Sequence, residues 1–528
     1  MQKIVIYTAS LNYSLRKSIY ALLSSYNGIR ILLLHENRET PILDKVVRQV
    51  PNIKKHGYRW FIAAFKECAQ MMGNKNSYAR ESCLRVPGCD YDEHNILGSN
   101  RVEYICCEDL HGSDVIQKTK DFSPDLGIAI SAPILKEHLF RLPRLGSLNL
   151  HKGKVPHYRG MPPAFWELWN DEKEVGCTIH KIESGLDTGD VLLEASIKIR
   201  KYSTARGLQI ELDELAIDLL VQAIEILRNN RAVWRKQPEG GHTYRKPTLR
   251  QISIMNKRCQ PTKRDARYYA KQTFYWFYIN VFSNLRKIFS NDKKIVVLLY
   301  HRVNDELRDD VTVGIEQFDR QMSILNRYGY SVLRIDQIIN DTNVWDKYKR
   351  IAAVTFDDGY YDNFKYAVPI LLRNKINAAF FISTGIIGTE RSFPHDLAKN
   401  RPYLQNLSWE NVKRMHEYGF TIGSHTESHL NCATSNPELT RKEIRNSKRT
   451  LETILNLKDV IFAYPHGKRT DITPEMLQLV RDEGYLGCLS AYGGVNRPPI
   501  DRYNIVRVGI DWKYSDLGFR ARLAGFCR

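Results

Sequence analysis

Residues 351–359, Ile-Ala-Ala-Val-Thr-Phe-Asp-Asp-Gly, join an apolar run to a pair of carboxylates. Consecutive apolar and β-branched residues favour a strand that is covered on both faces, as in a parallel sheet. Asp357 and Asp358 follow at the carboxyl end of that strand, which is where α/β folds usually carry their chemistry. We therefore expect an α/β domain with a reactive site at this edge of its sheet.

Short apolar runs alternate with helix-like stretches on both sides of this segment. Further strands are predicted at 295–300, 378–382, 421–423 and 460–464, with a helix over 437–455. Repeated strand and helix units of this length indicate a β/α barrel or an open α/β sheet. We assign this pattern to residues 294–528.

Two histidines downstream are spaced to bind one metal ion. In His425-Thr-Glu-Ser-His429 the imidazoles lie at i and i+4, which share a helical face and can grip one metal. Two histidines and one carboxylate leave coordination positions open for water, as hydrolysis requires.

Thr-Phe-Asp-Asp-Gly together with Ser-His-Thr-x-x-His resembles the polysaccharide deacetylase (NodB-like) family over about residues 294–515. The resemblance implies Asp358, His425 and His429 as ligands of Zn or a similar divalent metal. It also implies Asp357 as the general base that activates the metal-bound water.

The sequence departs from this family in two places. The segment Phe462-Ala-Tyr-Pro-His-Gly467 carries no Arg before its aromatic and Pro residues, and a C-terminal Leu-x-His is absent. The general acid is then expected at His301, in Leu-Leu-Tyr-His-Arg, which resembles family members whose acid lies early in the chain. His466 is the second choice.

The N-terminal half also alternates apolar runs with helices. Strands are predicted at 4–7, 29–34, 126–130, 147–150 and 177–182, and they suggest a parallel, doubly wound sheet. A helix is expected over 205–227, with one apolar face formed by Leu208, Leu212, Leu215, Leu219 and Ile226. Because no Gly-x-Gly-x-x-Gly turn follows the first strand, a dinucleotide site of the nicotinamide type has little support.

Polar groups converge at one point of this half. Asn149 and His151 lie two residues apart at the end of a strand, so both point to the same side. The segment Gly-Leu-Asp-Thr-Gly-Asp at 185–190 places carboxylates in a tight turn. Asn149 and a protonated His151 can donate to the oxyanion of an acyl transfer. Asp187 can hold the imidazole or relay a proton.

Asn-Leu-His, Pro-x-Tyr-Arg-Gly and Leu-Asp-Thr-Gly-Asp, in this order, resemble the formyltransferases that use N10-formyltetrahydrofolate over about residues 1–250. The resemblance implies Asn149, His151 and Asp187 as the catalytic trio. It also implies a folate pocket formed by Ser131, Ala132, Pro133, Ile134 and Leu135.

The acceptor of the formyl group has two candidate classes. A net charge of +19 suits anionic partners, including the phosphates of an initiator tRNA. However, only a helix and the segment at 243–247 follow the catalytic part, which leaves little room for a tRNA-binding domain. We therefore expect a nucleotide-linked or lipid-linked amino sugar and no specific nucleic acid.

Residues 251–293 form a basic, aromatic connector that contains Tyr-Trp-Phe-Tyr-Ile at 275–279. One interpretation is an interfacial helix that lays aromatic side chains on an anionic membrane surface. The alternative is a helix clamped between two domains.

These observations predict a formyltransferase domain at 1–250, the connector, and a deacetylase domain at 294–528. We expect a bifunctional, cytoplasmic enzyme that removes an N-acyl group from an amino sugar and installs formyl, with the inner membrane face as a further location. No segment has the roughly 20 apolar residues of a membrane span, and no signal peptide is recognised.

One alternative is a sugar or tRNA formyltransferase with an impaired deacetylase-like domain. The other is a basic membrane or RNA-binding protein on retired enzyme scaffolds.

Overall fold

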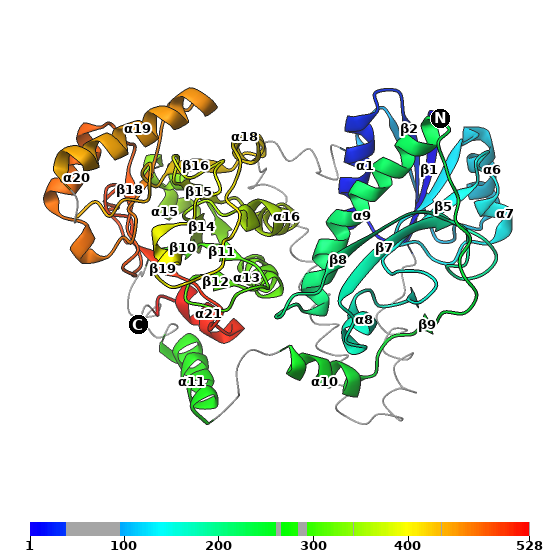
Figure 1. Cartoon of the computed structure of the whole chain (residues 1–528), viewed down its shortest axis with the longest axis horizontal. Coiled ribbons are helices and arrows are strands. Elements are labelled where there is room, and N and C mark those ends of the chain that lie inside the picture. Colours follow the sequence, from blue (N-terminus) through cyan, green and yellow to red (C-terminus); the bar gives the residue numbers. More distant parts are fainter. Residues whose placement is uncertain (38–95, 260–265, 283–292, 342, 434–435, 527–528) are drawn as a thin grey trace. The chain divides into compact units, whose positions relative to one another are not determined.

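The computed structural model describes residues 1–37, 96–259, 266–282, 293–341, 343–433 and 436–526. These residues fall into two compact units, one ending at Cys259 and the other beginning at Ala266. Figure 1 shows the elements of each unit.

The first unit is built on a seven-stranded sheet in the order β3-β2-β1-β4-β5-β7-β8. Five neighbouring strands are parallel, and β7 and β8 are antiparallel to their neighbours. The strands are β1 (Lys3–Thr8), β2 (Arg30–Glu36), β3 (Val102–Cys107), β4 (Leu126–Ala129), β5 (Ser147–His151), β7 (Glu174–Lys181) and β8 (Val191–Lys198). The sequence predicts the parallel part, but the strand expected at 177–182 is antiparallel to β5, which corrects that expectation. Strand β8 follows it after the loop 182–190 and is antiparallel to it in turn.

Helices cover both faces of this sheet, as a doubly wound fold requires. Ile4 and Ile6 face one apolar core while Val5 and Tyr7 face the other, because side chains alternate along a strand. The first core is covered by α1 (Tyr13–Ser25) and α9 (Ala205–Arg228), and the second by α6 (Ser113–Phe122) and α7 (Glu137–Phe140). Of the predicted apolar face of α9, Leu208, Leu212 and Leu219 are buried.

Shorter elements complete the unit beside the carboxyl end of β5. They are β6 (Arg159–Gly160), α8 (Phe165–Trp169), β9 (Thr243–Tyr244) and α10 (Leu249–Arg258). Strand β6 pairs in parallel with β9 and so brings the segment after α9 next to the segment after β5.

The second unit is a parallel sheet nearly closed into a barrel, in the order β18-β17-β16-β15-β14-β10-β19, with β13 also paired to β14. Its strands are β10 (Ile295–Tyr300), β13 (Ser331–Val332), β14 (Ile351–Phe356), β15 (Ala379–Ile382), β16 (Thr421–Ser424), β17 (Phe462–Ala463), β18 (Cys488–Leu489) and β19 (Arg507–Gly509). A parallel bridge between Leu489 and Ile505 brings the two ends of the sheet together. The prediction of a β/α barrel is confirmed.

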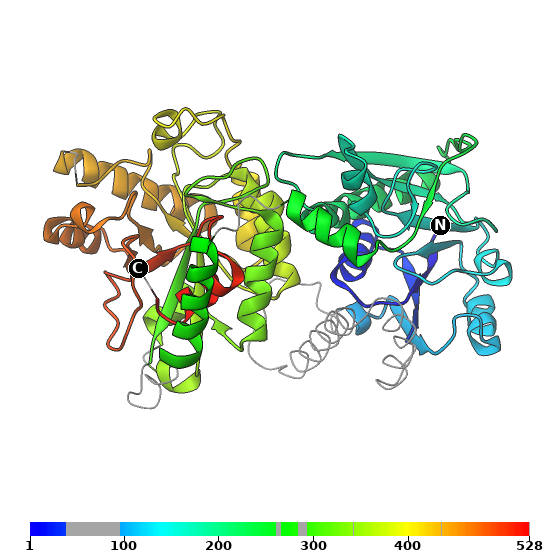
Figure 2. The same ribbon diagram turned by 90° about the horizontal axis from the view of Figure 1, so that it is seen from below.

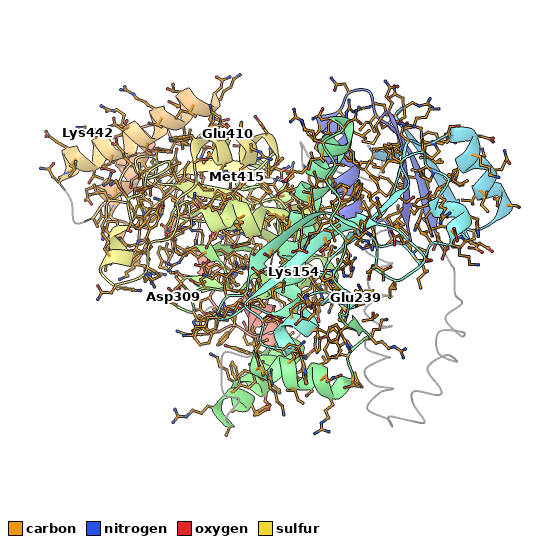
Figure 3. All side chains as sticks on the ribbon, turned by 45° about the vertical axis from the view of Figure 1, so that its right-hand side comes forward. Lys154, Glu239, Asp309, Glu410, Met415 and Lys442 are labelled. Atoms are coloured by element: carbon orange, nitrogen blue, oxygen red, sulfur yellow. The ribbon has the colours of Figure 1, made fainter. Side chains whose placement is uncertain are left out.

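Helices surround the barrel strands (Figures 1 and 2). They include α13 (Ile315–Arg327), α14 (Ile335–Asn340), α15 (Val344–Lys347), α16 (Val368–Arg373), α17 (Pro394–Leu397), α18 (Trp409–Glu417), α19 (Pro437–Leu455), α20 (Pro474–Asp482) and α21 (Asp516–Leu523). A small ladder of β11 (Arg302–Val303) and β12 (Thr312–Val313) follows the first strand. Figure 3 labels the buried Met415 of α18 and the exposed Lys442 of α19.

The described residues of the connector are mainly helical: residues 251–259 belong to the first unit with α10, and residues 266–282 belong to the second unit. Helix α11 (Ala266–Phe277) buries Tyr275, whose ring lies 5.8 Å from that of Phe526. Trp276 and Phe277 are 55% and 45% exposed. Residues 260–265 and 283–292 of the connector lie outside the described residues. Among the described helices, none is long and apolar enough to cross a membrane.

Candidate active sites

The first polar cluster lies at the carboxyl end of β5. Asn149 and His151 project to the same side of this strand, as their spacing predicts, and both reach Asp187. The Nδ2 atom of Asn149 donates to Oδ1 of Asp187 at 2.9 Å. The Nδ1 atom of His151 lies 3.5 Å from Oδ2 of the same carboxylate. The structure therefore brings the predicted trio together.

Asp187 is held in place by backbone as well as by side chains. It adopts a left-handed conformation with φ of 55° in the loop between β7 and β8, and Gly160 N donates to its Oδ2 at 3.1 Å. Gln237 donates to its main-chain oxygen. Burial favours the neutral acid, but the charge of His151 and the hydrogen bond from Gly160 N prevail and lower the pKa of Asp187 to about 2. This carboxylate is ionised at neutral pH.

A second imidazole, His180, belongs to the same cluster and was missed by the sequence reasoning. It is 2% exposed on β7, directly opposite Asn149 in the antiparallel register. Its Nδ1 donates to the carbonyl of Lys181 at 2.7 Å, so its Nε2 accepts from Asn149 Nδ2 at 3.3 Å. The one available signal was a histidine inside an otherwise buried strand.

The ring of His151 has one nitrogen committed to the backbone. Nε2 lies 2.8 Å from the carbonyl oxygen of Tyr158, which can only accept, so this nitrogen carries the proton of the neutral ring. Burial lowers the pKa of His151, and the charge of Asp187 acts in the opposite direction. A second proton would therefore enter at Nδ1, next to the Asp187 carboxylate.

The predicted folate segment follows β4 at the same edge of the sheet. Ala129, the last residue of β4, is paired with Asn149. Ser131 has φ of 51°, and its carbonyl accepts from Ala9 N beyond the end of β1. Ile134 is 78% exposed while Leu135 is buried. Ala132 and Pro133 lie between them, and the role of residues 131–135 stays a prediction.

The second cluster lies at the carboxyl end of β14. Asp358 has φ of 77°, and its Oδ1 lies 3.1 Å from His429 Nε2 and 3.5 Å from His425 Nε2. All three residues are buried, and their ligand atoms lie within 4.8 Å of one another. The structure thus assembles the three predicted metal ligands.

The two histidines are not on a helix, which corrects the expectation drawn from their i, i+4 spacing. They lie on the loop after β16, where Thr426 and His429 both have φ of 62°. The carboxylate of Glu443, on α19, accepts from Glu427 N and Ser428 N and from the Ser428 hydroxyl. These bonds fix the loop, so left-handed residues, not helical periodicity, aim the imidazoles.

The donor set fits a divalent cation. Neither carboxylate oxygen of Asp358 has a hydrogen-bond donor among the described residues, although both are buried. His425 donates from Nδ1 to the Ala463 carbonyl at 2.8 Å, which leaves its Nε2 lone pair facing Asp358. Buried anionic oxygens and bare imidazole nitrogens at one point are the ligands that zinc prefers.

The neighbouring Asp357 has a partner that the sequence did not reveal. Arg507, on β19, is fully buried and donates to both carboxylate oxygens at 2.6 and 2.7 Å. Burial would raise the pKa of Asp357, but the Arg507 charge prevails and lowers it. An arginine thus orients the predicted base, but from the last barrel strand rather than from the segment at 462–467.

Other imidazoles surround this cluster. His301 follows β10, and burial lowers its pKa while Asp358 and Asp357 oppose that shift. His466 is exposed, with its ring 5.2 Å from that of His429. Both therefore stay candidates for the general acid. His395, on α17, was not predicted, and its Nε2 lies 3.5 Å from Oδ2 of Asp358.

Comparison with known families identifies both units. Residues 98–224 match the family described as formyl transferase, and residues 346–486 match the family described as polysaccharide deacetylase. The chain therefore combines a formyltransferase domain with a polysaccharide deacetylase domain, and both resemblances noted in the sequence are confirmed.

Similar proteins carry related names. Methionyl-tRNA formyltransferase of Caldanaerobacter subterraneus subsp. tengcongensis is 34% identical over 132 residues, which span 25% of this chain and 43% of that protein. The structure of Streptococcus pyogenes deacetylase PplD in complex with acetate aligns with a TM-score of 0.37 and 22% identity, covering 43% of this chain and 96% of that chain. WlaRD, a sugar 3N-formyl transferase in the presence of dTDP and 5-N-formyl-THF, aligns with a TM-score of 0.29 and 17% identity, covering 45% and 67%.

Proposed function

We propose that this chain is a bifunctional enzyme that exchanges the acyl group on the nitrogen of an amino sugar. The deacetylase domain would hydrolyse an N-acyl group, and the formyltransferase domain would then transfer formyl from N10-formyltetrahydrofolate to the freed amine. The observation that carries the proposal is the presence, in one chain, of two assembled polar sites that both suit chemistry at an amide carbonyl. Linking them would raise the effective concentration of the amine at the second site.

For formyl transfer, the amine attacks the formyl carbon and a tetrahedral oxyanion forms. Asn149 is the proposed donor to that oxyanion. Its contact with His180 at 3.3 Å is longer than the one with Asp187 at 2.9 Å, so the hydrogen facing His180 is the one to be released. His151 would take the amine proton at Nδ1, where ionised Asp187 stabilises the resulting cation. It would return this proton to N10 as the bond between the formyl carbon and N10 breaks and tetrahydrofolate leaves.

For hydrolysis, a bound zinc or similar divalent ion would polarise the acyl carbonyl and make a water acidic enough to attack. Asp358, His425 and His429 would hold the ion. Asp357, oriented by Arg507, would accept the proton of the attacking water. His301 would protonate the leaving amine, with His466 as the second candidate.

A nucleotide-linked amino sugar is the proposed acceptor, with a lipid-linked sugar as a related choice. Only β9 and α10 follow α9 in the described part of the first unit, which supports a small acceptor over tRNA. The curated relative named above is a tRNA formyltransferase, but the chain spans less than half of its length. Initiator tRNA is therefore the second candidate.

One experiment separates these acceptors. Purified protein is incubated with N10-formyltetrahydrofolate and a panel of nucleotide-linked amino and acetamido sugars, or with initiator tRNA, and products are identified by mass spectrometry. We expect a sugar to gain formyl and an acetamido sugar to lose acetyl. Formylated tRNA with unchanged sugars would overturn the acceptor assignment.

Metal content tests whether the deacetylase domain is a live hydrolase or a retired scaffold. We expect one zinc or similar ion per chain in the wild type and its loss in His425→Ala, measured by elemental analysis. A wild type that binds no metal would leave a formyltransferase joined to an impaired domain.

Use of a folate co-substrate supports a cytoplasmic location for the reaction. The exposed Trp276 and Phe277 of α11, together with nearby Arg267 and Lys271, would suit contact with an anionic membrane surface. Cosedimentation with vesicles containing anionic lipid, compared with zwitterionic vesicles, tests this contact.

A further inference from the structure

His395 stands beside the metal-binding cluster on a segment that none of the recognised motifs includes. It belongs to α17, between β15 and β16, and its ring centroid lies 4.9 Å from that of His429. Its Nε2 lies 2.9 Å from the Tyr360 hydroxyl and 3.5 Å from Oδ2 of Asp358. One nitrogen therefore faces both a tyrosine oxygen and the carboxylate of a metal ligand.

The hydrogen-bond pattern fixes where the proton of His395 lies. The Tyr360 hydroxyl donates its only hydrogen to Oδ2 of Asp396 at 2.6 Å. Its oxygen can then only accept from His395, so Nε2 of that ring carries the proton. Oδ2 of Asp358 lies 3.5 Å from the same nitrogen without a hydrogen bond in this structure, so a small shift of the carboxylate would let this N–H be shared between two acceptors.

The segment that carries His395 is anchored to the barrel by buried charges. Asp396 accepts from Arg401 at 3.0 Å and from the fully buried Arg302 at 3.4 Å. Phe393, which is also buried, stacks on the His395 ring with centroids 5.5 Å apart. The ion pairs of the adjacent Asp396 and the stacked ring of Phe393 therefore fix the orientation of the His395 ring and the direction of its N–H.

We propose that His395 is a positioning residue for the metal site. Its Nε2–H donates to Oδ2 of Asp358 when a cation is bound, and this bond keeps Oδ1 aimed at the cation together with His425 and His429. The inference rests on the proposed metal-dependent hydrolase. Hydrogen bonds to a ligating carboxylate orient it, and their loss typically weakens metal binding 10- to 100-fold.

Metal affinity measured on the full chain tests this role without any substrate. Zinc binding is determined by competition with a chromogenic chelator for the wild type, His395→Ala, His395→Phe and His395→Gln. We expect about 10- to 100-fold weaker binding for the alanine and phenylalanine variants. The glutamine variant should recover much of the loss, because its amide nitrogen occupies the place of Nε2 and donates.

The phenylalanine variant separates positioning from packing, since it keeps a ring against Phe393 and removes the donor. Wild-type affinity in His395→Phe would mean that the ring only packs, and the inference would fail. His416→Ala removes a histidine of α18 and controls for nonspecific zinc binding, and thermal unfolding checks that each variant is folded.

Two further outcomes are distinguishable. If the wild type binds no zinc, the proposed hydrolase fails before this inference is reached. If X-ray absorption spectra at the zinc edge show three coordinated imidazoles in the wild type and two in His395→Gln, His395 is a direct ligand and the positioning role is wrong.

Discussion

Asp187 and Asp358 are both buried, both have positive φ, and both lie among histidines, yet their surroundings differ in kind. Asp187 receives hydrogen bonds from the Asn149 amide and the Gly160 N–H. Neither oxygen of Asp358 has a hydrogen-bond donor among the described residues. A carboxylate satisfied by protein donors suits proton handling, whereas one left with bare oxygens beside bare imidazole nitrogens suits a cation. The partners of a buried carboxylate therefore distinguish these two acyl sites.

Removing divalent metal should separate the two sites most sharply. Treatment with 1,10-phenanthroline is expected to reduce deacetylation to background while formyl transfer keeps its rate, because a cation is proposed only for the Asp358 site. Both products are followed by mass spectrometry in one reaction, and added zinc should restore hydrolysis. Equal loss of both activities would contradict the prediction that only deacetylation needs a divalent metal.

Asp357, the proposed base of the hydrolase, gives the next largest effect. Asp357→Asn keeps a similar shape but cannot accept a proton, so kcat for deacetylation should fall about 10²- to 10⁴-fold. Zinc content should stay at the wild-type level. A variant with full activity would show that Arg507 holds a structural aspartate.

At the formyltransferase site, Asn149→Ala removes the proposed oxyanion donor. We expect kcat to fall about 10²- to 10³-fold with little change in KM, since the bond strengthens in the transition state. Deacetylation by the same preparation is the internal control. A change confined to KM would instead indicate a role in ground-state binding.

The variant Arg507→Met tests the contribution of the buried Arg507–Asp357 ion pair to the free energy of unfolding. Removing the arginine leaves the Asp357 charge uncompensated, which is expected to destabilise the second unit by about 3–5 kcal/mol. The double variant Asp357→Asn, Arg507→Met should recover much of this loss in denaturant unfolding. If the double variant is no more stable than Arg507→Met alone, the pair does not act as a unit.

The smallest expected effect is the contribution of Asp187 to the pH dependence of the free energy of unfolding. Its pKa is about 2 in the folded chain, against about 3.9 in unfolded peptides. Ionised Asp187 therefore stabilises the fold above about pH 4, and this contribution, about 2–3 kcal/mol, disappears as pH falls toward 2. Unfolding of wild type and Asp187→Asn from pH 5 to 2 should show a shallower decline in the variant. Parallel curves would contradict the low pKa.

Much of this architecture is predictable because local pattern and tertiary packing agree. The apolar run at β14 and the periodicity of α9 give these elements close to their observed bounds. The turn motif at 185–190 locates Asp187, and the strand-end motif at 357–359 locates Asp358. Spacing alone misplaced His425 and His429 on a helix, because an i, i+4 pair also fits a loop with left-handed residues.

Contacts between residues far apart in the sequence could not be predicted, because no local sequence pattern indicates them. Arg507 lies 150 residues from Asp357, and no motif pairs them. His395 belongs to a short helix whose place beside Asp358 depends on buried charges from other segments. These groups meet only when the nearly closed barrel has formed.

That closure sets an order in which the two activities can appear during synthesis. The formyltransferase cluster uses residues up to Tyr244 of β9, which pairs with Gly160, whereas the proposed hydrolase base waits for Arg507 on β19. A ribosome-bound chain could therefore complete its first pocket long before its second, and loss of β19 by proteolysis would silence hydrolysis alone.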